Sequence, residues 1–360
     1  MPEPSRHITG RYRQGMPPPA ERPPAGERVQ RPGCLLAAGL LLAIGSAAVA
    51  ALFFLLVLRP AAPAGSNAIW LGIDWGRAAQ KDEDVRQLAG LLRAEGIGTV
   101  YVWTTWLQAD GTWSATTFPT IRAFVDQFRR FYPEARLDAW IGIPAEVPEY
   151  RLDDTDLQDT VAAFAAQALS EYAFDAVHLN VEPVWNGDEN FLDLLRAVRQ
   201  AIGDEAVLSI AVPPDWNTGA PGIPVGPYTT TDAHWSQEYK QRVAFLVDEL
   251  VVMAYNSGLS TPEDYQTWMA FQVTQYLSAL ESLGIETQLL FGIPTYDAEL
   301  PGHDPAAESI PAAIEGIRQG LVQSGEAARR FRGLALYAYW STDALEWETY
   351  RRLWLAPDRG

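Results

Sequence analysis

Short apolar runs rich in β-branched and aromatic residues recur eight times along the chain, and amphipathic stretches separate them. Stretches such as Val85–Ala94, Asp159–Ser170, Phe191–Ile202 and Tyr265–Leu283 have helical periodicity. Because strands that alternate with helices pair in parallel, the pattern predicts an α/β fold. Eight such units fit a (β/α)8 TIM barrel, which takes about 250 residues. The runs begin near Ala68, Gly98, Leu137, Asp175, Ala206, Glu249, Gln288 and Arg332.

An open, doubly wound sheet is the alternative fold for the same alternation. Such sheets often bind nucleotides through a glycine-rich turn after the first strand. The segment after the first run, Gly72–Gly76, lacks the spacing of that fingerprint. A barrel is therefore favoured over a nucleotide-binding sheet.

The N-terminal part of the chain has a different character. Residues 1–33 are rich in Pro and Arg, which predicts a disordered tail. Residues 34–58 are apolar and uncharged throughout, and they exceed the roughly 20 helical residues needed to cross a bilayer. Residues 59–67 read as a linker to the domain at 68–360. The fold class is therefore a barrel preceded by a single transmembrane helix.

Arginines set the expected orientation of this span. Arg22, Arg28 and Arg31 precede it, whereas only Arg59 follows closely. Positive charge concentrates on the cytoplasmic side, so the N-terminus is expected in the cytoplasm and the barrel outside the cell membrane. A cleaved signal peptide is the competing interpretation, and the length of the apolar run argues against it.

Charge and composition narrow the possible partners. Residues 1–66 carry seven Arg and three Glu, a net charge of +4; the total of −18 therefore leaves −22 for the rest. A domain this acidic repels a phosphate backbone, so nucleic acid is not an expected partner. The single cysteine, Cys34, and four scattered histidines show no metal-ligand spacing. No metal or organic cofactor is expected.

Aromatic and polar residues gather where the predicted strands end. In a barrel, the active site lies at those carboxyl ends. Indole faces stack on sugar rings, while carboxylates and amides bind hydroxyls, so we expect an oligo- or polysaccharide ligand. The residues are Asp74, Trp75, Trp103, Glu146, Asn180, Glu182, Trp185, Trp216, Tyr255, Asn256, Tyr296, Asp297 and Trp340.

The fourth strand is the most informative, because side chains alternate across a strand. If Val177, Leu179 and Val181 face the helices, His178, Asn180 and Glu182 face the barrel interior. Polar residues on the inside of a core strand are costly unless they are hydrogen-bonded or functional. A carboxylate at the rim favours a functional role for Glu182.

This strand resembles the D-G-x-D-x-D-x-E motif of glycoside hydrolase family 18, with Asp175 at its start and Glu182 at the catalytic acid. Met253–Asn256 resembles the family's M-x-Y-D, Gly292–Tyr296 its G-[IL]-P-x-Y, and Tyr339–Asp343 its eighth-strand tryptophan segment. The matches are short, follow the family's order and cover nearly all of 68–350.

The chain also departs from the family pattern. Ala176 replaces the glycine, His178 and Asn180 replace the two inner aspartates, and Asn256 replaces the aspartate after the tyrosine. The pairing of Asn180 with Glu182 resembles glycoside hydrolase family 85, endo-β-N-acetylglucosaminidases that use an asparagine and a glutamate.

The resemblance implies substrate-assisted hydrolysis of N-acetylglucosamine glycans, an exception to the two-carboxylate mechanism. It makes Glu182 the general acid and base, and Asn180 and Tyr255 the groups that hold the acetamide. Trp340 is expected at the floor of the sugar site, with Tyr337 as its rival. The further substrate-binding residues are Trp75, Trp103, Trp185, Trp216, Asn256, Tyr296 and His178, the last bonded to Asn180 or simply buried.

Three other hypotheses remain open. One is a catalytically weak or inactive carbohydrate-binding barrel of the cell envelope, which the substitutions at His178 and Asn180 favour. Another is a retaining glycosidase with two carboxylates about 5–5.5 Å apart, for which Asp297, Glu146 or Asp74 would be the second. The third is a membrane-tethered scaffold, since fold alone does not decide function.

Overall fold

The computed structural model describes residues 66–106, 118–145, 151–215, 222–224, 234–281 and 283–355. Residues 59–360 form one compact unit. The tail at 1–33, the apolar span at 34–58, Glu146 and Trp216 lie outside the described residues. Within those residues, no helix is both long enough and apolar enough to cross a membrane.

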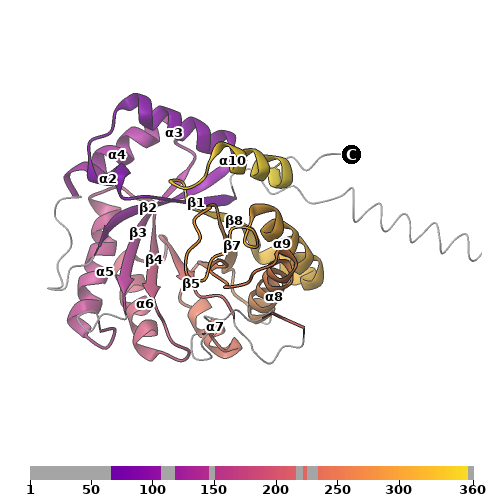
Figure 1. The fold of residues 1–360 in the computed structure, drawn as a ribbon. Coiled ribbons are helices and arrows are strands. Elements are labelled where there is room, and N and C mark those ends of the chain that lie inside the picture. The colour runs from indigo at the N-terminus through magenta and orange to yellow at the C-terminus, as the bar shows by residue number, and fades with distance from the viewer. Residues whose placement is uncertain are drawn as a thin grey trace, which may run out of the picture. The chain divides into compact units, whose positions relative to one another are not determined.

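Eight parallel strands close into a barrel in which every strand pairs with its neighbours in sequence, and β1 pairs with β8 (Figure 1). This confirms the predicted (β/α)8 fold over an open sheet, and each strand begins within one residue of its predicted start. The strands are β1 (Asn67–Leu71), β2 (Ile97–Trp106), β3 (Arg136–Pro144), β4 (Ala176–Glu182), β5 (Val207–Val212), β6 (Glu249–Met253), β7 (Gln288–Pro294) and β8 (Phe331–Tyr337).

Helices lie between successive strands and cover the outside of the barrel (Figure 1). They are α2 (Asp74–Arg77), α3 (Asp82–Ala94), α4 (Phe118–Phe131), α5 (Thr155–Ser170), α6 (Glu189–Ile202), α7 (Gln237–Ala244), α8 (Pro262–Glu281), α9 (Ile310–Ser324) and α10 (Ala344–Tyr350). A 3-10 helix (Gly325–Arg330) precedes β8 and a π-helical turn (Arg351–Leu355) follows α10.

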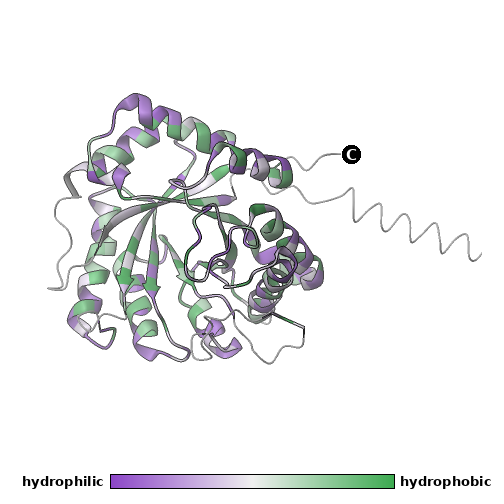
Figure 2. Cartoon of the chain, viewed as in Figure 1, coloured by the Kyte–Doolittle hydropathy of each residue, from purple (hydrophilic) through white to green (hydrophobic). Residues whose placement is uncertain are grey.

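Local signals in the sequence set the helix ends. The predicted start of α8 is confirmed, because the Thr261 hydroxyl accepts a hydrogen bond from the Asp264 backbone N–H at 3.2 Å. Proline then occupies the first helical position, where no N–H is needed. Asp343 and Glu346 form a reciprocal capping box at α10. The covering helices carry both apolar and polar residues along their length (Figure 2).

The core has two layers. The larger one lies between strands and helices and contains the outward side chains of β4, Val177, Leu179 and Val181. A smaller cluster fills the barrel interior and includes Trp70 and Tyr101. The predicted alternation of β4 is therefore confirmed.

Charged side chains fill the amino-terminal end of the barrel. The buried carboxylate of Glu249 is bonded by Arg136 at 3.0 Å, by Tyr101 at 2.9 Å and by Arg332. Burial alone would raise the pKa of Glu249, but the two guanidinium groups hold it below its ordinary value. This network occupies the closed end of the barrel and leaves the carboxyl end for function.

Candidate active site

Three inward side chains of β4 lead from the core to the barrel mouth. His178 is fully buried, Asn180 is half-buried and Glu182 is exposed at the strand's end. The gradient follows from strand geometry, since alternate residues on one face climb along the barrel axis. Glu182 is therefore the member of the row that can meet a ligand from solvent.

His178 belongs to the core network. Its Nδ1 lies 2.9 Å from the Ser209 hydroxyl, and that hydroxyl donates to Glu249 at 3.0 Å. Nδ1 must therefore carry the proton and donate to Ser209. The imidazole stacks on Tyr101 with ring centroids 3.9 Å apart. Burial, with a smaller contribution from Arg136, lowers the pKa of His178 to about 3, so the ring is neutral.

The predicted hydrogen bond from His178 to Asn180 is wrong. Within the described part of the chain, neither Nε2 of His178 nor Oδ1 of Asn180 has a hydrogen-bond partner. The physical reason is the competing acceptor on β5: Ser209, already tied to Glu249, takes the only N–H of the neutral ring. The alternative, a buried core histidine, describes His178 better than contact with substrate.

Asn180 and Glu182 form a hydrogen-bonded pair at the mouth. The Asn180 amide nitrogen donates to Glu182 Oε2 at 3.0 Å, which leaves Oδ1 of Asn180 as a buried acceptor. A buried acceptor without a protein partner is unfavourable unless water or a ligand satisfies it. The pair therefore offers a carboxyl group and an amide oxygen side by side.

Two tyrosines flank this pair. Tyr255 follows β6, Tyr337 ends β8, and their rings stack with centroids 4.9 Å apart at an interplanar angle of 18°. Burial first and the nearby Glu182 charge next raise the pKa of Tyr337, and burial raises that of Tyr255 further. Both hydroxyls are therefore neutral. Gly292 makes room for Tyr255, since a Cβ there would lie 3.0 Å from its ring.

Trp340 lies farther out than Tyr337. It is 54% exposed and meets Tyr337 edge-on at 5.6 Å. A Cβ on Gly72 would come within 3.0 Å of its indole, so the glycine permits this position. Tyr337 stacks on Tyr255 inside the mouth, and Trp340 lies farther out and is more exposed to solvent.

Asn256 and Tyr296 pair across two neighbouring loops. The Tyr296 hydroxyl donates to Asn256 Oδ1 at 2.5 Å. Asn256 has a left-handed backbone with φ of +56°, which asparagine tolerates better than most residues. Since Oδ1 is occupied, the amide N–H groups of Asn256 face away from Tyr296.

The remaining predicted tryptophans lie in different surroundings. Trp75, in α2, packs between Phe124 of α4 and Tyr339, as a helix-layer residue does. Trp103 of β2 meets Trp140 edge-on at 4.5 Å. Trp185, just beyond β4, is 46% exposed. Trp185 is therefore exposed like Trp340, whereas Trp75 is half-buried against other aromatic side chains.

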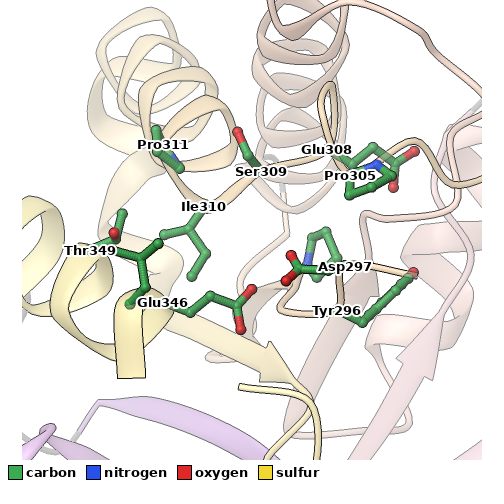
Figure 3. Close-up of a pocket in the computed structure, with 11 residues that line it drawn as sticks. Tyr296, Asp297, Pro305, Glu308, Ser309, Ile310, Pro311, Glu346 and Thr349 are labelled. Atoms are coloured by element: carbon green, nitrogen blue, oxygen red, sulfur yellow. The ribbon is translucent and has the colours of Figure 1, made fainter. Parts of the chain in front are cut away.

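Asp297 and Asp74, two of the carboxylates considered for a second catalytic role, lie on elements other than β4. Asp297 lines a side pocket of about 150 Å³ beside α10, where Figure 3 shows its carboxylate turned toward that of Glu346. Burial, and the charges of Asp297 and Asp343, raise the pKa of Glu346 to about 7. Asp74 lies in α2. In the described ranges, no cluster of His, Cys, Asp and Glu could hold a metal ion.

The comparisons with known proteins agree with this geometry at the level of the fold. No family model and no curated protein matches the chain. Solved structures do: a family GH18 chitinase from Cycas revoluta in complex with allosamidin superposes with a TM-score of 0.52. It is 16% identical, over 80% of this chain and 99% of that one. The chain has the barrel fold of the family 18 chitinases.

Two further structures share this fold. A plant class V chitinase mutant from the same species, bound to (GlcNAc)3, gives a TM-score of 0.54 at 14% identity over 80% of this chain and 99% of that one. The spore cortex-lytic enzyme SleL of Bacillus cereus gives 0.53 at 12% identity over 79% and 73%. At these identities the likeness is one of fold, and it agrees with the barrel that the sequence predicts.

Proposed function

We propose that the protein is a glycosidase that hydrolyses N-acetylglucosamine-containing glycans with assistance from the substrate's own acetamide. The observation that carries the proposal is the Asn180–Glu182 pair, with its free buried amide oxygen, at the mouth of a family 18-type barrel. Chitinases and a cortex-lytic enzyme with this barrel support the substrate class.

Glu182 begins the reaction as the general acid. It donates its proton to the glycosidic oxygen while the acetamide carbonyl oxygen attacks the anomeric carbon, and the bond to the leaving group breaks. The ring that forms carries positive charge, and its N–H donates to Oδ1 of Asn180. The neutral Tyr255 hydroxyl donates to the acetamide oxygen before it attacks.

The second step reverses the roles. The Glu182 carboxylate takes a proton from water, whose oxygen attacks the anomeric carbon with retention of configuration and restores the acetamide. Asn180 supplies an acceptor but no negative charge to the cationic intermediate. We therefore expect slower turnover than an aspartate at this position would give.

Aromatic side chains provide the sugar contacts in this proposal. Tyr337 forms the floor beneath the reacting sugar, and Trp340 and Trp185 stack on neighbouring sugars. Asn256 binds the polar edge of the reacting sugar, and Tyr296 acts there through its hydrogen bond to Asn256. Trp103 and Trp216 are further stacking residues of the proposal. Exposed tryptophans on opposite sides of the mouth suit an extended glycan better than a monosaccharide.

The test compares wild type with Glu182→Gln on fluorogenic N-acetylglucosamine oligomers, with glucose and galactose glycosides as substrate controls. Hydrolysis confined to the N-acetylated substrates and lost in Glu182→Gln is expected. Glu299→Gln, an equivalent change at an exposed residue of the β7–α9 loop, is the matched control and should keep wild-type rates. Hydrolysis of glucosides would point to a two-carboxylate enzyme. Binding without hydrolysis would point to a carbohydrate-binding barrel.

We also propose that residues 34–58 anchor the barrel outside the cell membrane. The support is the uninterrupted uncharged span of 25 residues, with arginines concentrated before it. Full-length protein should then sediment with membranes and resist salt extraction, and external protease should reach the barrel in intact cells. Release by salt, or protection of the barrel from external protease, would contradict the anchor or its orientation.

A further inference from the structure

A buried carboxylate outside the proposed catalytic set ties together two loops of the barrel mouth. Glu308 precedes α9 and is 2% exposed. It accepts hydrogen bonds from the backbone N–H of Asn256 at 2.8 Å, from the backbone N–H and hydroxyl of Ser257, and from His303 Nδ1 at 2.8 Å. Hydrogen bonds to a carboxylate are stronger than those between neutral groups, so Glu308 holds the two loops together firmly.

His303 links Glu308 to the backbone of Tyr296. His303 Nε2 lies 3.0 Å from the Tyr296 carbonyl oxygen, which can only accept, so Nε2 carries a proton. Nδ1 faces the Glu308 carboxyl group at 2.8 Å. His303 and Glu308 are both buried, so water does not compete for this hydrogen bond. The pair acts as one hydrogen-bonded unit.

This unit holds Asn256 from both ends. Glu308 binds its backbone N–H in the left-handed conformation, and the Tyr296 hydroxyl binds its side-chain oxygen. Tyr296 is in turn held through its carbonyl by His303, whose ring its own ring contacts at 4.1 Å. Figure 3 shows the polar ends of Tyr296 and Glu308 on the side away from Glu346. The backbone and the side-chain oxygen of Asn256 are therefore both held by hydrogen bonds.

We propose that Glu308 and His303 are positioning residues for the glycosidase proposed above, and that they orient Asn256 so that its amide N–H groups bind an acceptor oxygen of the sugar. The inference rests on the proposed function. Asn256 is exposed, and among the described residues no acceptor takes its Nδ2 hydrogens. The family pattern has an aspartate here, an acceptor, so this chain presents donors at that point instead.

The experiment uses full-length protein in mild detergent, with the N-acetylglucosamine oligomer that wild type hydrolyses fastest. In Glu308→Gln an amide N–H2 replaces one acceptor oxygen, so the backbone N–H of Asn256 or that of the neighbouring Ser257 loses its partner. We expect KM to rise roughly tenfold or more with kcat within about threefold, because the lost contact binds ground and transition states equally. Tyr296→Phe frees the other end of Asn256 and should have a similar effect.

The double variant distinguishes positioning from general damage. If both changes act through Asn256, Glu308→Gln combined with Tyr296→Phe should raise KM by roughly the larger single effect, not by their product. Glu299→Gln is the charge-matched control. Thr287→Val, which removes two buried hydrogen bonds to Ala244 and Val247 at the far end of the barrel, is the stability control. Both controls should keep wild-type KM.

The outcomes separate the two proposals. Wild-type KM in Glu308→Gln, or fully multiplicative effects in the double variant, would overturn the positioning role and leave the proposed function standing. If wild type hydrolyses none of the oligomers, the proposed function fails, and the same variants are compared by calorimetry for affinity to the N-acetylglucosamine trimer. The same tenfold pattern in affinity supports positioning, and its absence overturns it.

Discussion

His178 makes a quantitative prediction about acid stability. Its pKa of about 3 in the folded barrel compares with 6.5 for an ordinary histidine. Because the folded state disfavours the proton, stability is fully present above the unfolded pKa and falls as the pH drops from 6.5 toward 3. Over the 1.5 units between 6.5 and about pH 5, at ~1.36 kcal/mol per unit, the loss attributable to this residue is ~2 kcal/mol.

The perturbation is His178→Asn, which keeps a side-chain N–H near Ser209 but has no titrating ring. Urea unfolding of residues 59–360 at about pH 7.5 and at about pH 5 gives the change in unfolding free energy for each protein. The variant loses ring contacts with Tyr101 at both pH values, and this cost cancels in the difference. The change should be ~2 kcal/mol smaller in the variant. Equal changes in the two proteins would refute the assignment of a buried, neutral His178.

Three further predictions test the site and its frame. Asn180→Ala removes the proposed acceptor for the acetamide N–H together with the donor to Glu182, and should lower kcat/KM about 100-fold or more in steady-state assays, with Tm nearly unchanged. Glu249→Gln leaves Arg332 without a carboxylate partner at the closed end of the barrel and leaves Arg136 with Asp138 alone, and it should cost about 3–5 kcal/mol in urea unfolding. Gly320→Ala would place a Cβ 2.5 Å from Val273 Cβ where α9 packs on α8, and should cost about 1–3 kcal/mol by the same assay.

The barrel could be predicted from sequence because each strand and helix has a recognisable pattern within its own stretch of residues. Strand starts such as Glu249 and Gln288 follow from apolar runs bounded by polar residues, and α8 from its Thr-Pro-Glu start. The inward row of β4 followed from period-two alternation, which a regular strand must obey. These features depend on neighbours in sequence, so one chain is enough to infer them.

The hydrogen bonds that position the site residues could not be predicted in this way, because they join residues that are far apart in the sequence. Glu308 reaches Asn256 across 52 residues, and His303 lies in a loop with no periodicity. The partner of His178 could not be chosen from sequence either, because it depends on the register of β4 against β5, which pairs His178 with Ser209. The sequence does contain one signal for this contact. Charged residues stand at the starts of three predicted strands, and they indicate a polar network at the amino-terminal end of the barrel with which a buried histidine can bond. These residues are Arg136, Asp138, Glu249 and Arg332.

Direct evidence on the central claim would come from fluorogenic N-acetylglucosaminides whose acetyl group carries zero, one, two or three fluorine atoms. Fluorine weakens the carbonyl oxygen as a nucleophile and leaves the Asn180–Glu182 geometry unchanged. If the acetamide attacks the anomeric carbon, kcat/KM should fall steeply with each fluorine added, and Glu182→Gln should be inactive on every member of the series. Rates independent of fluorine content would contradict substrate assistance at this site.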